Sequence, residues 1–172
     1  MLSWARFFIQ VCFLRAAPQD APGSKSIRNI SIAVYFAIGM LVSLHTQPLL
    51  PSLFVAFMQT LILVFITNLL LLIRKTPERF DQTVTALMGT GALIGLVAIP
   101  ILNLILVTGG EASNLSFLWI VLIAWETAVA GHILRHAMDV TFITALGVAL
   151  IYMYVSFAIT FRVIKIITYL LR

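Results

Sequence analysis

Apolar runs long enough to cross a membrane recur along the chain. A spanning helix needs about 20 mostly apolar residues, and turn-forming residues divide this sequence into five such runs. The runs cover residues 30–46, 53–73, 83–107, 117–134 and 142–161. Prolines in "QPLLPS" separate the first two runs, and glycines in "TGGEASN" follow the third. The pattern predicts an all-α fold, a transmembrane helix bundle of about five spans over residues 30–172.

A shorter amphipathic segment precedes these runs. As a helix, Leu2 to Leu14 would be about 20 Å long, too short for a hydrocarbon core of about 30 Å. Ser3, Arg6 and Gln10 fall on one helical stripe, and large apolar side chains cover the rest. We therefore expect residues 1–29 to form an interfacial helix followed by a flexible linker, "AAPQDAPGSK". Simple anchoring is the expected role of this helix, and docking of a partner protein is the alternative.

The composition supports the membrane assignment. Of the 172 residues 62% are hydrophobic and 10% are charged, which is more apolar surface than a soluble core of this length could bury. The net charge of +5 does not indicate a nucleic-acid partner, because the basic residues lie between the apolar runs. The single cysteine, Cys12, excludes an internal disulfide. The expected surroundings of the chain are therefore a lipid bilayer.

Basic residues mark alternate connections between the runs. They precede the first run, lie between the second and third, and recur as Arg135 between the fourth and fifth, whereas the other two connections have none. Because positive loops stay in the cytoplasm, this pattern predicts a cytoplasmic amino terminus. Five crossings then place Arg162, Lys165 and Arg172 on the outer side, against the same rule.

Glu126 is the one acidic residue near the middle of a run. An acid at that depth costs about 2.5 to 3.5 kcal/mol on the insertion scale, which the neighbouring apolar residues outweigh. The side chain should turn away from lipid toward polar groups of other helices. Candidate partners at that depth are Asn68, Gln59, Asn103, Tyr152 and Tyr154. Two roles stay open for Glu126, a hydrogen-bonding group that joins helices or a proton- or cation-binding group on a transport path.

A polar cluster follows Glu126 at the end of the fourth run. His132, Arg135, His136 and Asp139 form one stripe of a helix, and the two histidines have a spacing that suits a metal. The neighbouring Arg135 disfavours a bound cation, so we expect a cytoplasmic-boundary cluster in which Asp139 caps the next helix. The histidines do not suit a haem with two histidine ligands either. The second ligand would have to be His45, at the opposite end of the bundle. We expect no metal and no cofactor.

Gly91 and Gly95, in "MGTGALIG", form a small-xxx-small pattern. Such a groove admits a closely packed helix, either from the same chain or from another membrane protein or second copy. The chain has no HExxH, no GxSxG and no phosphate-binding glycine loop with its lysine, so we expect no enzymatic activity.

Two stretches of the sequence resemble the Yip-domain family of small five-span membrane proteins, in its compact bacterial form. They are "ALMGTGALIGLVAIPIL" and "LWIVLIAWETAVAGHILRHAMDVTFITALGVAL", and the resemblance covers about residues 30–161. It implies a non-enzymatic helper or scaffold, and the compact form leads us to expect a bacterial inner membrane. The family's longer eukaryotic amino-terminal region is absent, so its association with Rab-type GTPases is not carried over. The alternatives are a small proton- or cation-linked transporter or channel subunit using Glu126, and a membrane enzyme or metal site at His132, His136 and Asp139.

Overall fold

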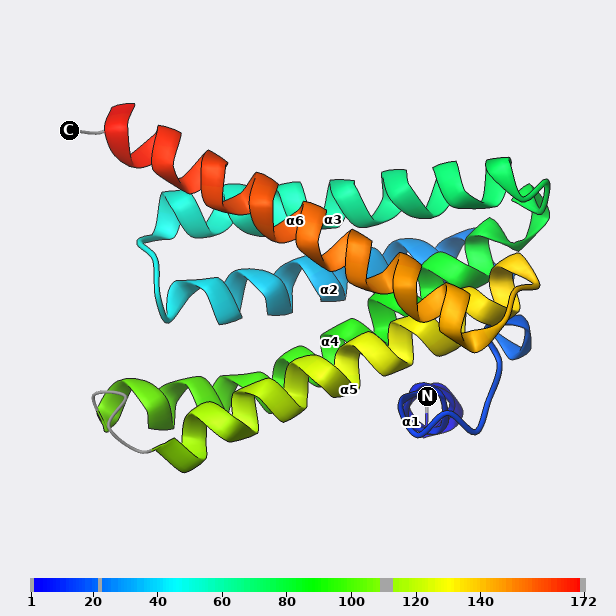
Figure 1. Cartoon of the computed structure of the whole chain (residues 1–172), viewed down its shortest axis with the longest axis horizontal. Coiled ribbons are helices and arrows are strands. Elements are labelled where there is room, and N and C mark those ends of the chain that lie inside the picture. Colours follow the sequence, from blue (N-terminus) through cyan, green and yellow to red (C-terminus); the bar gives the residue numbers. More distant parts are fainter. Residues whose placement is uncertain (1, 22, 109–112, 171–172) are drawn as a thin grey trace.

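A computed structural model describes residues 2–21, 23–108 and 113–170, and it confirms an all-α fold (Figure 1). The described residues contain no β-strand. Six α-helices follow one another along the chain: α1 (Leu2–Cys12), α2 (Lys25–Leu44), α3 (Leu49–Ile73), α4 (Phe80–Val107), α5 (Ser113–Met138) and α6 (Phe142–Leu170). Two short 3₁₀ turns, η1 (Pro18–Asp20) and η2 (Pro77–Arg79), lie before α2 and α4.

The five long helices, α2 to α6, are each long and apolar enough to cross a membrane. Large apolar side chains cover their outer surfaces, for example Phe65 at 66% exposed and Phe117 at 64%. Water would strongly disfavour so much contiguous apolar surface, whereas hydrocarbon does not. The chain is an integral membrane protein, and the prediction of five spans is confirmed.

The helices are longer than the predicted runs. α2 begins at Lys25 rather than at residue 30, and α6 continues to Leu170 rather than ending at residue 161. An apolar run marks only the part of a helix that suits hydrocarbon, whereas backbone hydrogen bonding continues into polar flanking residues.

The bundle has two different ends (Figure 1). At the end that we call the closed end lie the α3–α4 and α5–α6 connections, and α1 packs against α4 and α5 in the same half of the bundle. At the opposite, open end, α4 and α5 diverge together from α2, α3 and α6. The bundle is therefore wider at the open end.

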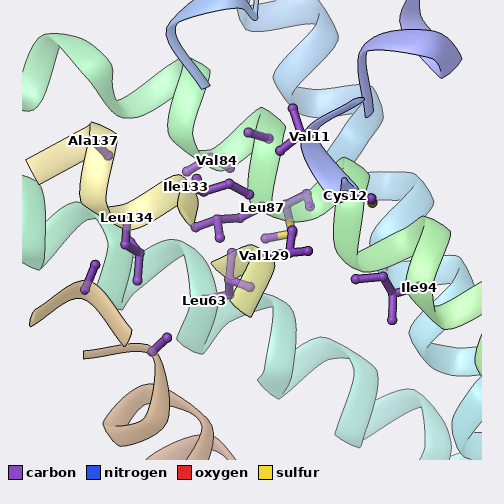
Figure 2. Close-up of a cluster of buried hydrophobic side chains, with 14 of the residues drawn as sticks. Val11, Cys12, Leu63, Val84, Leu87, Ile94, Val129, Ile133, Leu134 and Ala137 are labelled. Atoms are coloured by element: carbon purple, nitrogen blue, oxygen red, sulfur yellow. The ribbon is translucent and has the colours of Figure 1, made fainter. Parts of the chain in front are cut away.

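The best-packed core lies toward the closed end. Figure 2 shows Val84 and Leu87 of α4 beside Val129 and Ile133 of α5, with Leu63 of α3 next to them. Val84 and Ile133 are completely buried. Since lipid is as apolar as these side chains, close packing rather than expulsion from water holds this end together.

The amino-terminal segment packs against this core. Figure 1 shows α1 end-on, so it crosses the direction of the long helices. Val11 and Cys12 are buried, and Trp125 of α5 donates a hydrogen bond from Nε1 to the Cys12 carbonyl oxygen at 2.9 Å. The following residues are not the flexible linker that the sequence predicts, because Pro18 is buried and the Gln82 amide binds the carbonyl of a buried residue, Ala21, at 3.0 Å. Residues after α1 therefore belong to the folded bundle.

The predicted glycine groove on α4 is filled by α2 of the same chain. A β-carbon on Gly91 would lie 2.7 Å from Cε2 of Tyr35, and one on Gly95 would lie 2.8 Å from Cγ2 of Ile38. Both distances are shorter than real contacts of this kind. The two glycines therefore let α2 approach α4 closely, and Gly91 makes room for the Tyr35 ring.

Candidate functional site

A cavity of about 450 Å³ lies between the five long helices and extends from the middle of the bundle toward the open end. Its walls include Val42 of α2, Thr46 of the α2–α3 connection, Leu102 of α4, Trp119 of α5 and Thr160 of α6. The cavity therefore occupies the space where α4 and α5 separate from the other helices.

A second cavity of about 50 Å³ continues toward the closed end. Most of its lining is apolar, with Leu63, Leu70, Leu87 and Leu134 among its walls. The residues that line both cavities are Tyr35, Gly91, Ile94, Glu126, Tyr152 and Met153. The wide cavity thus narrows at mid-bundle to a small apolar continuation.

Glu126 lies at this narrowing. Its side chain is only partly exposed, and it interacts electrostatically with Tyr35 of α2 and Tyr152 of α6. The two tyrosine side chains are hydrogen-bonded to each other. Among the residues that line the two cavities, Glu126 is the only acidic residue, and no lysine, arginine or histidine is present. No ion pair to it occurs within the described part of the chain.

The candidate partners of Glu126 separate into two groups. Tyr152 lies next to it, and Gln59 of α3 lines the wide cavity. Asn68, Asn103 and Tyr154 are exposed on the outer surface and line neither cavity. Depth alone is therefore not enough to identify a partner.

The angular position on the helix explains this outcome. Asn68 follows Gln59 by nine residues, and nine steps of 100° turn a side chain by about 180° to the opposite face of α3. Asn103 follows the cavity-lining Ile94 by the same nine residues. Both asparagines therefore face the surface that lipid covers.

Sequence reasoning missed Tyr35. The signal that could have found it is its position, a tyrosine inside the first apolar run whose hydroxyl needs a hydrogen-bonding partner in hydrocarbon. Its packing against Gly91 could not be foreseen without knowing that α2 and α4 are neighbours.

The two histidines of the boundary cluster bind backbone carbonyl groups. His132 is buried, and its Nε2 lies 3.1 Å from the carbonyl oxygen of Ala16, in the segment after α1. His136 places its Nδ1 2.8 Å from the carbonyl oxygen of His132. Because a carbonyl oxygen only accepts, His132 Nε2 and His136 Nδ1 both donate a hydrogen bond, and neither of these two nitrogens can bind a metal ion in this arrangement. The described residues hold no group of three or more His, Cys, Asp or Glu side chains that could bind a metal ion.

Side chains from the α3–α4 connection cap the last turn of α5. Arg79 donates from Nη1 to the carbonyl oxygens of His136, at 2.9 Å, and Ala137, at 3.3 Å. Arg74 donates from Nε to the Met138 carbonyl oxygen at 3.1 Å. The carbonyl groups at a helix end have no partner within the helix, so these positive groups satisfy them and oppose the negative end of the helix dipole. They tie the closed end together.

The prediction that Asp139 caps the next helix is wrong. Asp139 pairs with Arg79 at 2.8 Å and has a left-handed backbone, with a φ of 51°, where the chain turns after α5. The first turn of α6 is capped by Thr141, whose hydroxyl accepts a hydrogen bond from the Thr144 backbone N–H at 3.3 Å. The fourth member of the cluster, Arg135, is exposed. The cluster therefore joins the helices of the closed end.

Comparisons with known proteins found no relative. No family model, no curated protein and no solved structure matches the chain. The resemblance to the Yip-domain family consequently stays a prediction, and the function has to be argued from the cavity and its carboxyl group.

Proposed function

We propose that this protein is a small transporter in which Glu126 binds a proton or a cation. The observation that carries the proposal is the position of Glu126, at the point where the wide cavity of the open end narrows into the small cavity toward the closed end. Ionisable groups in membrane spans are costly and are typical of ion and proton pathways. A carboxyl group that serves only to join helices has no need of a cavity beside it.

We also propose the orientation of the protein in a bacterial inner membrane. The closed end carries Arg74, Lys75 and Arg135, so the positive-inside rule places it in the cytoplasm. The wide cavity then opens toward the outer side. The 29 residues of α6 span about 43 Å, longer than a hydrocarbon core of about 30 Å, which puts Arg162 and Lys165 at or beyond the outer boundary. Arg172 lies outside the described residues.

The helper or scaffold role implied by the Yip-domain resemblance is the competing proposal. Like the transport proposal, it assigns no enzymatic activity to the protein, and it requires no role for Glu126 beyond helix packing. A flux experiment on Glu126 distinguishes the two.

The test uses proteoliposomes that contain a trapped pH-sensitive dye and an imposed pH gradient. Sodium, potassium and organic monovalent cations are added outside in turn, and we expect at least one to accelerate proton movement through the wild-type protein. Glu126→Gln should slow that flux by at least about tenfold, because an amide carries neither the proton nor the charge.

Glu78→Gln is the matched control. It makes the same chemical change at an exposed carboxyl group in the α3–α4 connection, and it should leave the flux unchanged. Size-exclusion profiles check that each variant folds. Equal flux through wild-type and Glu126→Gln protein with every cation would contradict transport and favour the helper role.

A further inference from the structure

We infer that the cargo is a lipophilic monovalent organic cation, a molecule with one positive charge on an apolar body. This inference rests on the proposed transport function and names the class of solute that the same cavity would take. Three properties of the cavity support it: its size, its charge and the character of its walls.

The size of the cavity suits an organic molecule. Its volume of about 450 Å³ falls within the range of about 300 to 1,000 Å³ that is usual for small-molecule sites. A bare inorganic cation would fill only a small part of this space.

The charge of the cavity selects a cation. Glu126 is the only acidic residue among the lining residues, and no lysine, arginine or histidine lines either cavity. An anion would therefore meet a negative charge in surroundings of low dielectric constant and would find no positive group to balance its own. A single carboxylate balances a single positive charge.

The walls favour an organic cation over a metal ion. Aromatic side chains at four positions line the wide cavity, Tyr35, Trp119, Tyr152 and Phe157. Aromatic rings attract cations by about 0.5 to 2 kcal/mol, and their faces also accept an apolar body. A calcium ion needs about six to eight oxygen ligands, whereas the narrowing offers one carboxylate and two phenolic hydroxyls. The narrowing is thus poorly suited to a metal ion that needs this many oxygen ligands.

The test measures binding of tetraphenylphosphonium to purified protein in detergent by equilibrium dialysis, with protein-free micelles as the blank. Tetraphenylborate is the comparison ligand, because it has nearly the same shape and the opposite charge. We expect saturable binding of the cation to wild-type protein. Glu126→Gln should weaken it by at least about tenfold, since the counter-charge is lost at a partly buried site. Glu78→Gln should leave it unchanged.

Acid should also weaken binding, because protonation of Glu126 removes the counter-charge. The other titratable groups that line the cavities, Tyr35 of α2 and Tyr152 of α6, are neutral in acid and do not change. Two results would overturn the inference: equal binding of the cation by wild-type and Glu126→Gln protein, or equal binding of the borate anion by wild-type protein.

The two proposals fail in different ways. If tetraphenylphosphonium does not bind while sodium or potassium still drives a proton flux that depends on Glu126, the cargo class is wrong and transport stands. If the cation binds through Glu126 but no cation drives flux, transport is wrong and the cation specificity stands.

Discussion

Glu126 is the residue on which the proposed transport function depends. Its insertion costs about 2.5 to 3.5 kcal/mol, and no lysine or arginine in the described part of the chain forms an ion pair with it. The cavity beside it and the hydroxyls of Tyr35 and Tyr152 supply polar surroundings instead. The proposed function requires that these surroundings leave the carboxyl group able to exchange a proton or bind a cation, which a completely enclosed hydrogen-bonded acid could not do.

Cys12 reports on the docking of α1. Burial raises the pKa of its thiol to about 11, so about one thiol in a thousand is ionised at pH 8. The neutral, buried thiol contributes to the stability of α1 docking. This contribution is fully present below the pKa of an exposed thiol, about 8.5, and it is lost as the pH rises through about 11.

We therefore predict slow alkylation of Cys12 by iodoacetamide at pH 8 in detergent. The matched control is Gln10→Cys in a Cys12→Ser background, since Gln10 is exposed on the same helix. The control should react about a hundred times faster, because its thiol has an ordinary pKa. Equal rates would mean that α1 is not packed as described.

Single residues also show what could be predicted for the site. The sequence was enough to identify Glu126 and to propose Tyr152 beside it, because polar groups at mid-span depth are few. It could not distinguish Gln59 from Asn68, which have similar chemistry and opposite faces of α3. The side that faces the cavity depends on how α3 is rotated in the bundle, and an almost uniformly apolar helix carries little information about that rotation.

At the scale of elements, α5 is the helix that joins the site to the closed end. Glu126 lies near its middle, and its last carbonyl groups bind Arg74 and Arg79 of the α3–α4 connection. His132 further connects it to the segment after α1. The position of Glu126 in the cavity therefore depends on contacts made at the end of the same helix.

We predict that Arg79→Ala lowers the free energy of unfolding by about 1.5 to 3 kcal/mol, the range for hydrogen bonds to charged groups. The change removes two bonds to carbonyl oxygens of α5 and the ion pair with Asp139. Thermal unfolding in detergent measures the effect as a lower Tm. Arg135→Ala is the control, since it removes an exposed arginine from the same end of the bundle. Equal loss of stability in both variants would contradict the capping role.

The elements themselves were predictable to different degrees. Hydropathy identified all five long helices, because a helix that crosses the hydrocarbon core needs about 20 mostly apolar residues in a row. It did not identify the packing of η1, since the contacts of Pro18 and Ala21 join residues far apart in the sequence. The role of Asp139 was missed for a similar reason, because its partner Arg79 lies in another connection.

At the scale of the whole molecule, the two ends of the bundle have different structures. The closed end holds the packed core, the docked α1 and the arginine caps of α5. The open end holds the wide cavity, where α4 and α5 diverge from the other helices. A transporter with its cavity open to one side would have this asymmetry. In the sequence, only the distribution of basic residues indicates that the two ends differ.

Transport through this cavity requires that water enters it from the open end while the outer faces of the same helices contact lipid. Ser156 and Tyr154 of α6 test it well, because they lie at nearly the same depth; Ser156 lines the cavity and Tyr154 is exposed on the lipid-facing surface. Each is replaced by cysteine in a Cys12→Ser background and treated in intact cells with a charged, membrane-impermeant maleimide. We predict rapid labelling of Ser156→Cys and little labelling of Tyr154→Cys. Equal, slow labelling of both would contradict a water-filled cavity that leads to Glu126.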